Sequence, residues 1–201
     1  MTPPLEVLVE ELSAEYALTA LMDTIVPDVE YAIRVYRGKH DLLKKLPNRL
    51  RGYANYPWPV QVVVLVDRDA DDCRKLRAKL DTIAVEAGLT PTGPGRSVLN
   101  RIAVEELEAW FFGDPAAVTA AFPRVPSTVG GRRQFRDPDA IAGGTAEALE
   151  KLLNDHGYHR AGLVKTEAAI EIADHMDVER NTSRSFQVFR DGLRTFVKGR
   201  A

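Results

Sequence analysis

Acidic side chains directly follow two strongly apolar segments of this sequence. Glu10 and Glu11 come after residues 5–9, and the run Asp-Arg-Asp-Ala-Asp-Asp at 67–72 comes after residues 61–66. Several ionised carboxylates on a short stretch repel one another. A hard divalent cation such as Mg²⁺ removes that cost and still binds waters and substrate phosphate oxygens. The residue types therefore indicate metal-assisted chemistry on a phosphate ester, with Mg²⁺ or Mn²⁺ as the cofactor.

Local helix chemistry offers a second explanation for some of these acids. Ser13 is expected to cap a helix that runs to about Val26, and Glu11 and Glu15, four residues apart, would then face the same site. The alternative for residues 69–72 is that they are caps and first-turn acids of the next helix, which its dipole favours. An EF-hand loop is excluded, because Asp72 and Ala78 stand where that loop requires Gly and Glu.

The apolar segments alternate with helical patterns over the first half of the chain. Strands are expected at 5–9, 31–35, 61–66 and 98–104. The run at 61–66 has no polar alternation, as in a parallel strand covered on both faces. Helices are expected between the strands, the second of them broken or bent by Pro47. This order predicts an α/β protein with a mostly parallel sheet flanked by helices, in which the carboxyl ends of the strands form the binding edge.

The second half reads as helical and basic. Helices are expected at 105–112 and 114–122, and then at about 145–155, 165–176 and 185–197, around a loop at 123–144. We therefore expect an α/β core over residues 1–122 and, over 123–201, a basic loop with a C-terminal helical lobe packed on that core as one domain. The loop arginines, which are expected to contact phosphates unless they are ordinary surface residues, are Arg124, Arg132, Arg133 and Arg136.

Composition restricts the class of protein without selecting a substrate. The chain has 201 residues and a formal net charge of −2, so any attraction to nucleic acid must come from a local basic patch. A single cysteine, Cys73, and the lack of a signal-like N-terminus or a long apolar run predict a cytoplasmic protein that does not enter a membrane. Arginines of the last helical region, such as Arg190 and Arg194, are expected to contact phosphates or to pair with the acids of the sheet.

Two motifs together resemble a known family. Val-Glu-Glu-Leu-Ser-Ala-Glu at 9–15 and Asp-Arg-Asp-Ala-Asp-Asp at 67–72, each after an apolar strand, resemble the TOPRIM domain of topoisomerases, primases and OLD-type nucleases. A closer resemblance, over nearly the whole chain, is to a TOPRIM-like family known as domain of unknown function 4276. It extends to the segments at 38–43 and 102–114 and to a lysine-led helix followed by Arg-Asn-Thr-Ser-Arg-Ser-Phe at 180–186.

This resemblance implies a role for each matching residue. Glu11, Asp67 and Asp69 are implied to hold a first metal ion, with Asp71 as a further acid of the same run. Glu15 and Glu106 are implied to help with a second ion, although Glu106 and its neighbour Glu108 are equally compatible with a solvated helix start. Lys165 is implied to stabilise charge on the phosphoryl group, unless it is an ordinary surface lysine.

The function that follows is a Mg²⁺-dependent nuclease, or a related phosphodiester-processing protein, with a two-metal TOPRIM/Rossmann-like site. Such a protein would act on nucleic acid, DNA rather than RNA, in phage defence or genome maintenance. An ATPase of the AAA or ABC type is an expected partner, and a homodimer is an expected assembly. The alternative is a non-catalytic module that binds a metal or nucleotide as a subunit of an ATPase complex.

Overall fold

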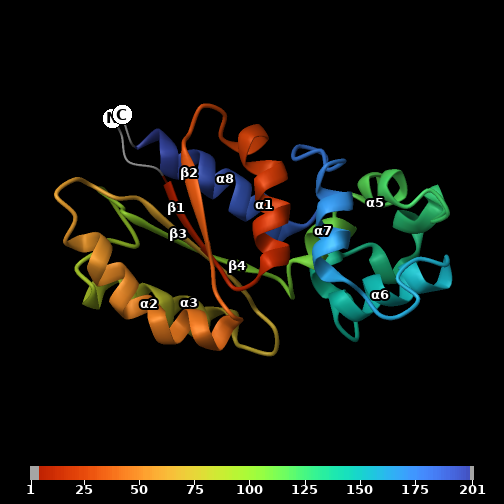
Figure 1. The fold of residues 1–201 in the computed structure, drawn as a ribbon, viewed down its shortest axis with the longest axis horizontal. Helices are drawn as coiled ribbons and strands as arrows, with labels where there is room; N and C mark the ends of the chain where they lie inside the picture. The colour runs from red at the N-terminus through yellow and green to blue at the C-terminus, as the bar shows by residue number, and fades with distance from the viewer. Residues whose placement is uncertain (1–4, 200–201) are drawn as a thin grey trace.

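The protein, seen here as a computed structural model that describes residues 5–199, is an α/β fold built on one parallel sheet (Figure 1). Its strands are β1 (Leu5–Val9), β2 (Tyr31–Val35), β3 (Val62–Asp67) and β4 (Val98–Ala103), in the order β2-β1-β3-β4. All three neighbouring pairs are parallel. The fold class and the four strand positions expected from the sequence are confirmed. In the described part of the chain, no helix is long and apolar enough to cross a membrane.

Alternate residues of the strands supply two separate cores. Val7, Val63 and Leu65 point to one face, which is covered by α1 (Leu12–Ile25) and α8 (Arg184–Lys198). Leu8 and Val64 point to the other, which is covered by α2 (Lys39–Ala54) and α3 (Cys73–Glu86). Successive side chains of a strand point to opposite faces, so a continuous apolar run can serve both cores.

Two expected helix starts are wrong, and helix α2 is not broken at Pro47. Helix α1 begins at Leu12 with Glu11 as its cap, so Ser13 lies inside the first turn instead of capping it. Helix α2 continues past Pro47 to Ala54, because proline removes one backbone hydrogen bond while Leu42, Leu46 and Leu50 stay buried on both sides of it. Helix α4 (Glu108–Phe112) begins at Glu108 and not at residue 105.

The remaining helices form a lobe beside the carboxyl edge of the sheet (Figure 1). They are α4, α5 (Pro115–Ala121), α6 (Thr145–Asp155) and α7 (Lys165–Ala173). The segment expected to be a loop contains three short 3₁₀ helices, Ser127–Gly131, Arg133–Phe135 and Pro138–Ala140. Helix α7 packs on α1, and α8 then returns to cover β4. The lobe and the sheet are therefore joined by helices that also build the larger core.

Candidate functional site

Four of the side chains predicted to form a site gather where the carboxyl ends of the strands meet the lobe. Glu11 follows β1, Asp67 is the last residue of β3, and Glu106 lies between β4 and α4. Lys165 is the first residue of α7 and is brought to this edge because α7 packs on α1. The placement of catalytic groups at this edge is the usual one in open α/β sheets.

The ammonium group of Lys165 lies among three carboxylates. Its Nζ is 3.2 Å from Oε1 of Glu108, 3.6 Å from Oε1 of Glu11 and 3.7 Å from Oε1 of Glu106. The Glu108 side chain is 1% exposed, and its Oε2 has no hydrogen-bond partner within residues 5–199. Burial raises the pKa of Glu108, whereas the three carboxylates together raise the pKa of Lys165 against the opposing effect of burial.

Asp67 and Glu10 form a second pair of carboxylates, at the end of β3. The backbone N–H of Asp67 donates to Oε1 of Glu10 at 2.8 Å, which turns Glu10 in toward the end of β3. Burial raises the pKa of Asp67 well above its usual range, and the nearby negative charges of Glu10 and Glu108 add to that effect. Burial likewise raises the pKa of Glu10 to about 7. Both groups thus lie in surroundings that disfavour an unneutralised negative charge.

Lys39 neutralises the aspartates at the outer rim of the site. Its Nζ lies 2.9 Å from Oδ2 of Asp69 and 2.7 Å from Oδ2 of Asp71, and it donates to the carbonyl of Arg68 at 3.0 Å. Asp69 has a φ of 49°, in the left-handed region that Asp tolerates better than most residues. This turn directs both aspartates toward α2 and its first residue, Lys39.

Glu106 is held in place by the start of a helix. Its Oε2 accepts from the backbone N–H of Ala146 at 2.9 Å and from Oγ1 of Thr145 at 3.1 Å, at the first turn of α6. Free N–H groups at a helix N-terminus favour a negative charge. Oε2 of Glu106 is therefore hydrogen-bonded to α6, and Oε1 is directed to Lys165.

The structure brings together only part of the predicted set. We call Lys165 and the carboxylates around it, Glu11, Asp67, Glu106 and Glu108, the inner cluster. Of the predicted residues it contains Glu11, Asp67, Glu106 and Lys165, whereas Asp69 and Asp71 are paired with Lys39 at its rim. Glu15 is half-buried in the first turn of α1, and its carboxylate makes no ion pair or hydrogen bond with any other described residue. In the same acidic run, Asp72 is a helix cap and accepts from the N–H of Lys75 at 2.9 Å.

Sequence reasoning gave no role to two residues of the candidate site, Glu10 and Lys39, and it left Glu108 open between an acidic motif and a solvated helix turn. Glu10 shares the strand-end position that singled out Glu11, and that position was a usable signal. Lys39 follows a glycine in a motif too short to be specific. A solvated helix turn is excluded for Glu108, because its side chain is only 1% exposed.

The arginines of the 123–144 segment lie in the lobe. The Arg124 guanidinium lies 4.0 Å from the ring centroid of Tyr158 and donates to the carbonyl of Gly157 at 3.0 Å. Arg132 and Arg133 are exposed and line a cavity of about 740 Å³, and Arg136 is exposed as well. Their role in binding nucleic acid stays a prediction.

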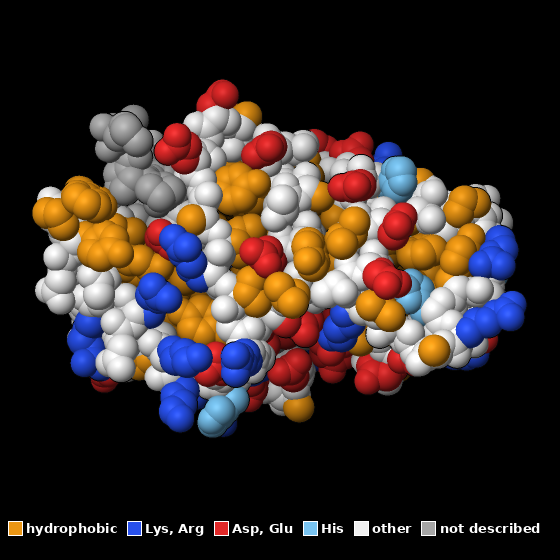
Figure 2. Space-filling model, in the orientation of Figure 1, with side chains coloured by type: hydrophobic (Ala, Val, Ile, Leu, Met, Phe, Trp, Pro, Cys, Tyr) orange, Lys and Arg blue, Asp and Glu red, His pale blue; other side chains and the backbone are white. Residues whose placement is uncertain are grey.

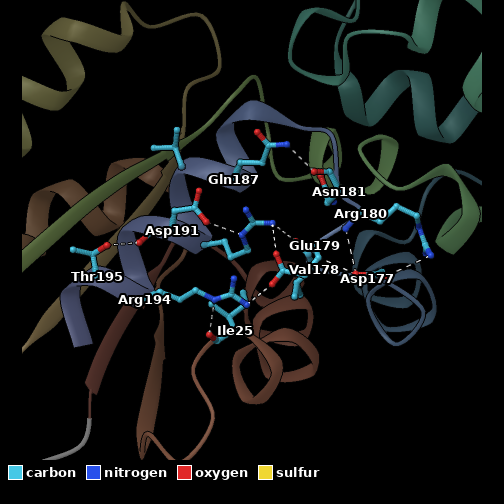
Figure 3. A network of polar contacts seen from close by, with 12 residues as sticks. Ile25, Asp177, Val178, Glu179, Arg180, Asn181, Gln187, Asp191, Arg194 and Thr195 are labelled. Carbon is cyan, nitrogen blue, oxygen red and sulfur yellow. Dashed lines mark hydrogen bonds and ion pairs between the residues drawn. The ribbon is translucent and has the colours of Figure 1, made fainter. Parts of the chain in front are cut away.

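The arginines of α8 stabilise the connection between α7 and α8 (Figure 3). Glu179 accepts contacts from Arg190 at 3.2 Å and from Arg194, whose Nε also donates to the carbonyl of Ile25 at 3.0 Å. Neither residue pairs with the acids of the sheet, and the expected contact with phosphate stays a prediction. They link the connection to the end of α1, the helix on which α7 packs.

The donor chemistry of the inner cluster fits a hard divalent cation. Every acidic group in it offers carboxylate oxygen, and the buried Oε2 of Glu108 lacks a partner. Within residues 5–199, however, no three Asp, Glu, His or Cys side chains are arranged as a ready-made metal site. Lys165 supplies positive charge at the centre of the cluster, so a bound cation would have to share or replace its contacts.

The fold and this site define an α/β protein with a carboxylate and lysine cluster at the carboxyl edge of a parallel sheet. The family model described as Domain of unknown function (DUF4276) matches residues 8–194, and the chain belongs to that family. Searches of curated proteins and of solved structures found no match.

Proposed function

We propose that the protein is a metal-dependent nuclease that hydrolyses phosphodiester bonds at the inner cluster. The observation that carries the proposal is the meeting of three carboxylates at Lys165, one of them the buried Glu108, beside Asp67. Such a concentration of acids around a single cation, with one of them buried, is costly for stability alone, and perturbed ionisable groups of this kind cluster at functional sites.

Each group has a chemical part in this proposal. Asp67, Glu11 and Glu108 are the residues that would hold Mg²⁺ or Mn²⁺. The ion would supply charge neutralisation on the phosphoryl group and an activated water. Lys165, whose pKa is raised, stays protonated at neutral pH and can bind a non-bridging phosphoryl oxygen. Glu10, whose pKa is raised to about 7, can accept a proton near neutral pH.

A non-catalytic module is the second candidate function. Lys165 and Lys39 already neutralise most of the carboxylates at this edge. Such pairing gives a stable pocket that could bind a nucleotide or a metal without turnover.

Cleavage assays with matched variants test the proposal. Purified protein is incubated with labelled single-stranded DNA, plasmid and RNA, in Mg²⁺ or Mn²⁺ and in EDTA, and Mn²⁺ binding is measured by calorimetry. We expect metal-dependent cleavage that is lost in Asp67→Asn and Glu11→Gln and retained in Glu86→Gln, a change at an exposed glutamate of α3.

The outcomes separate the two candidates. Metal binding that depends on Asp67, with no cleavage of any polymer, would support the non-catalytic module. Full cleavage by the Asp67→Asn protein would remove this residue from the site and contradict the proposal.

A further inference from the structure

A strongly basic segment lies next to the acidic site. Residues 31–56 contain seven Lys and Arg and a single acidic residue, in a chain whose net charge is −2. They form the edge strand β2 and helix α2. Figure 2 shows Lys and Arg side chains gathered over this part of the molecule, beside acidic ones at the carboxyl ends of the strands. Charge is thus segregated on the surface, as needed for a local polyanion site.

A pocket of about 350 Å³ opens within this basic surface. Its lining includes Tyr36, Lys45, Arg49, Tyr53 and Tyr56. The Lys45 ammonium is 6.0 Å from the ring centroid of Tyr36, and the Arg49 guanidinium is 5.8 Å from that of Tyr53. The Tyr36 side chain is buried, and the interaction of its hydroxyl with the Arg49 guanidinium raises the pKa of Arg49. The pocket therefore places a guanidinium and a phenol hydroxyl side by side.

Aromatic rings extend the pocket onto the surface. Tyr53 and Tyr56 meet edge to face with ring centroids 5.7 Å apart, and Tyr56 meets Trp58 at the same distance. Tyr56 is 46% exposed and Trp58 is 51% exposed. Neighbouring exposed rings of this kind are surfaces on which unpaired bases can stack.

The positive charges of the pocket are only partly neutralised from within. Glu6 is engaged by Arg34 and by the Tyr53 hydroxyl, and Asp41 pairs with Lys45. Among the ion pairs of the described residues, none includes Arg49. A guanidinium beside aromatic rings and free of a carboxylate suits a phosphate or the face of a base.

The same helix leads from this pocket to the acidic site. Lys39, at the start of α2, contacts Asp69, and Arg49 lies about 15 Å further along the helix axis at about 1.5 Å per residue. The pocket and its rings form one surface, made by Tyr36, Lys45, Arg49, Tyr53 and Tyr56, which we call the groove. We infer that the groove binds single-stranded DNA and directs it to the inner cluster. The inference deepens the proposed nuclease function and rests on it.

Single-stranded DNA is the ligand that matches these groups. Rings can stack only on bases that are not already paired, which disfavours an intact duplex. The rings and cations recognise base faces and phosphates, so binding does not require the 2′-hydroxyl by which proteins distinguish RNA.

Binding measured without metal tests the groove separately from cleavage. The probe is a fluorescein-labelled oligothymidine of about 15 nucleotides, a length within the range of known single-strand sites. Its anisotropy is measured in EDTA over a salt series. We expect Lys45→Ala/Arg49→Ala to weaken binding at least about tenfold. The slope of log affinity against log salt concentration should fall by the amount expected for the loss of about one to two phosphate contacts. Tyr56→Ala should weaken it by about tenfold through lost stacking.

The control variant is Lys151→Ala. Lys151 pairs with Asp155 four residues away, as Lys45 pairs with Asp41, but it lies in the lobe. We expect it to bind like the wild type. Arg49→Lys should keep most of the salt dependence, and unchanged thermal unfolding of each variant excludes misfolding.

Several outcomes would overturn the inference. These are absence of oligothymidine binding by the wild type, unchanged affinity of the double variant, and loss of binding only in Arg132→Ala/Arg133→Ala. Tenfold tighter binding of an equal-length RNA or duplex would overturn the choice of ligand. Binding that depends on the groove residues, without any cleavage in Mg²⁺, would support DNA binding by the groove. It would contradict only the proposed nuclease activity.

Discussion

The ammonium of Lys165 lies 3.2 Å from a carboxylate oxygen of Glu108, whose side chain is 1% exposed. The two residues come from two helices of the lobe, α7 and α4, and α4 is the helix that follows the last strand. This contact holds the two helices together beside the carboxyl edge of the sheet. It also makes the stability of the inner cluster depend on one cation.

Removal of the Lys165 ammonium group should destabilise the protein. Lys165→Met leaves the buried Glu108 carboxylate without its partner, and we expect the free energy of unfolding to fall by about 1–3 kcal/mol. Urea denaturation at neutral pH measures the change. In the Glu108→Gln background the same substitution should cost much less, because no buried charge is left unpaired. Equal costs in both backgrounds would show that the two residues are not coupled.

Asp67→Asn should leave the metal-free protein at least as stable as the wild type. The amide keeps the shape of the side chain and removes a buried negative charge that lies close to Glu10 and Glu108. Thermal unfolding in EDTA checks this. The contrasting variant is Asp81→Asn, because Asp81 accepts from Arg77 at 3.0 Å and from Asn100 at 2.7 Å. Asp81→Asn should lower the free energy of unfolding by about 1 kcal/mol. A larger loss in Asp67→Asn would mean that the Asp67 carboxylate has a structural role.

Glu6 should make stability depend on acid pH. Its carboxylate accepts from Arg34 at 2.9 Å and 3.1 Å and from the Tyr53 hydroxyl at 2.7 Å. Burial raises the pKa of Glu6, but these partners outweigh it and hold the pKa below the ordinary value of 4.5. A lowered pKa in the folded state means that the stabilisation is present above about pH 4.5 and is lost as the pH falls through the folded value.

The Glu6→Gln variant isolates that contribution. We expect it to lose about 1–3 kcal/mol of unfolding free energy at pH 7 and to show a flatter decline than the wild type below pH 5. Urea denaturation at a series of pH values from 3 to 7 measures both curves. Parallel curves would show that another group causes the acid sensitivity.

Arg180→Met should be among the most damaging changes at the α7–α8 connection. Asp114 is fully buried and accepts from Arg180 at 2.9 Å and 2.8 Å and from the N–H of Asp177 at 2.9 Å. Loss of the guanidinium leaves a buried charge with one remaining donor, which should cost about 3 kcal/mol. Lys151→Met breaks an exposed pair with Asp155 and should cost at most about 0.5 kcal/mol. Chemical denaturation of both variants tests whether burial determines the difference.

The sequence alone determined the sheet and the location of the site. Apolar runs such as residues 61–66 indicate buried strands, and alternation along them supplies both cores. Parallel strands end at a common edge, so acids that follow them must lie near one another. Glu11 and Asp67 could therefore be predicted without a structure.

Only the tertiary structure decided which side chains meet. Lys165 reaches the cluster because α7 packs on α1, a contact between helices that no local pattern encodes. The left-handed turn at Asp69 and the start of α2 decide that Asp69 and Asp71 pair with Lys39, and the packing around α4 leaves Glu108 only 1% exposed. Periodicity reports which face of an element is buried, whereas long-range packing sets the direction and partner of a polar side chain.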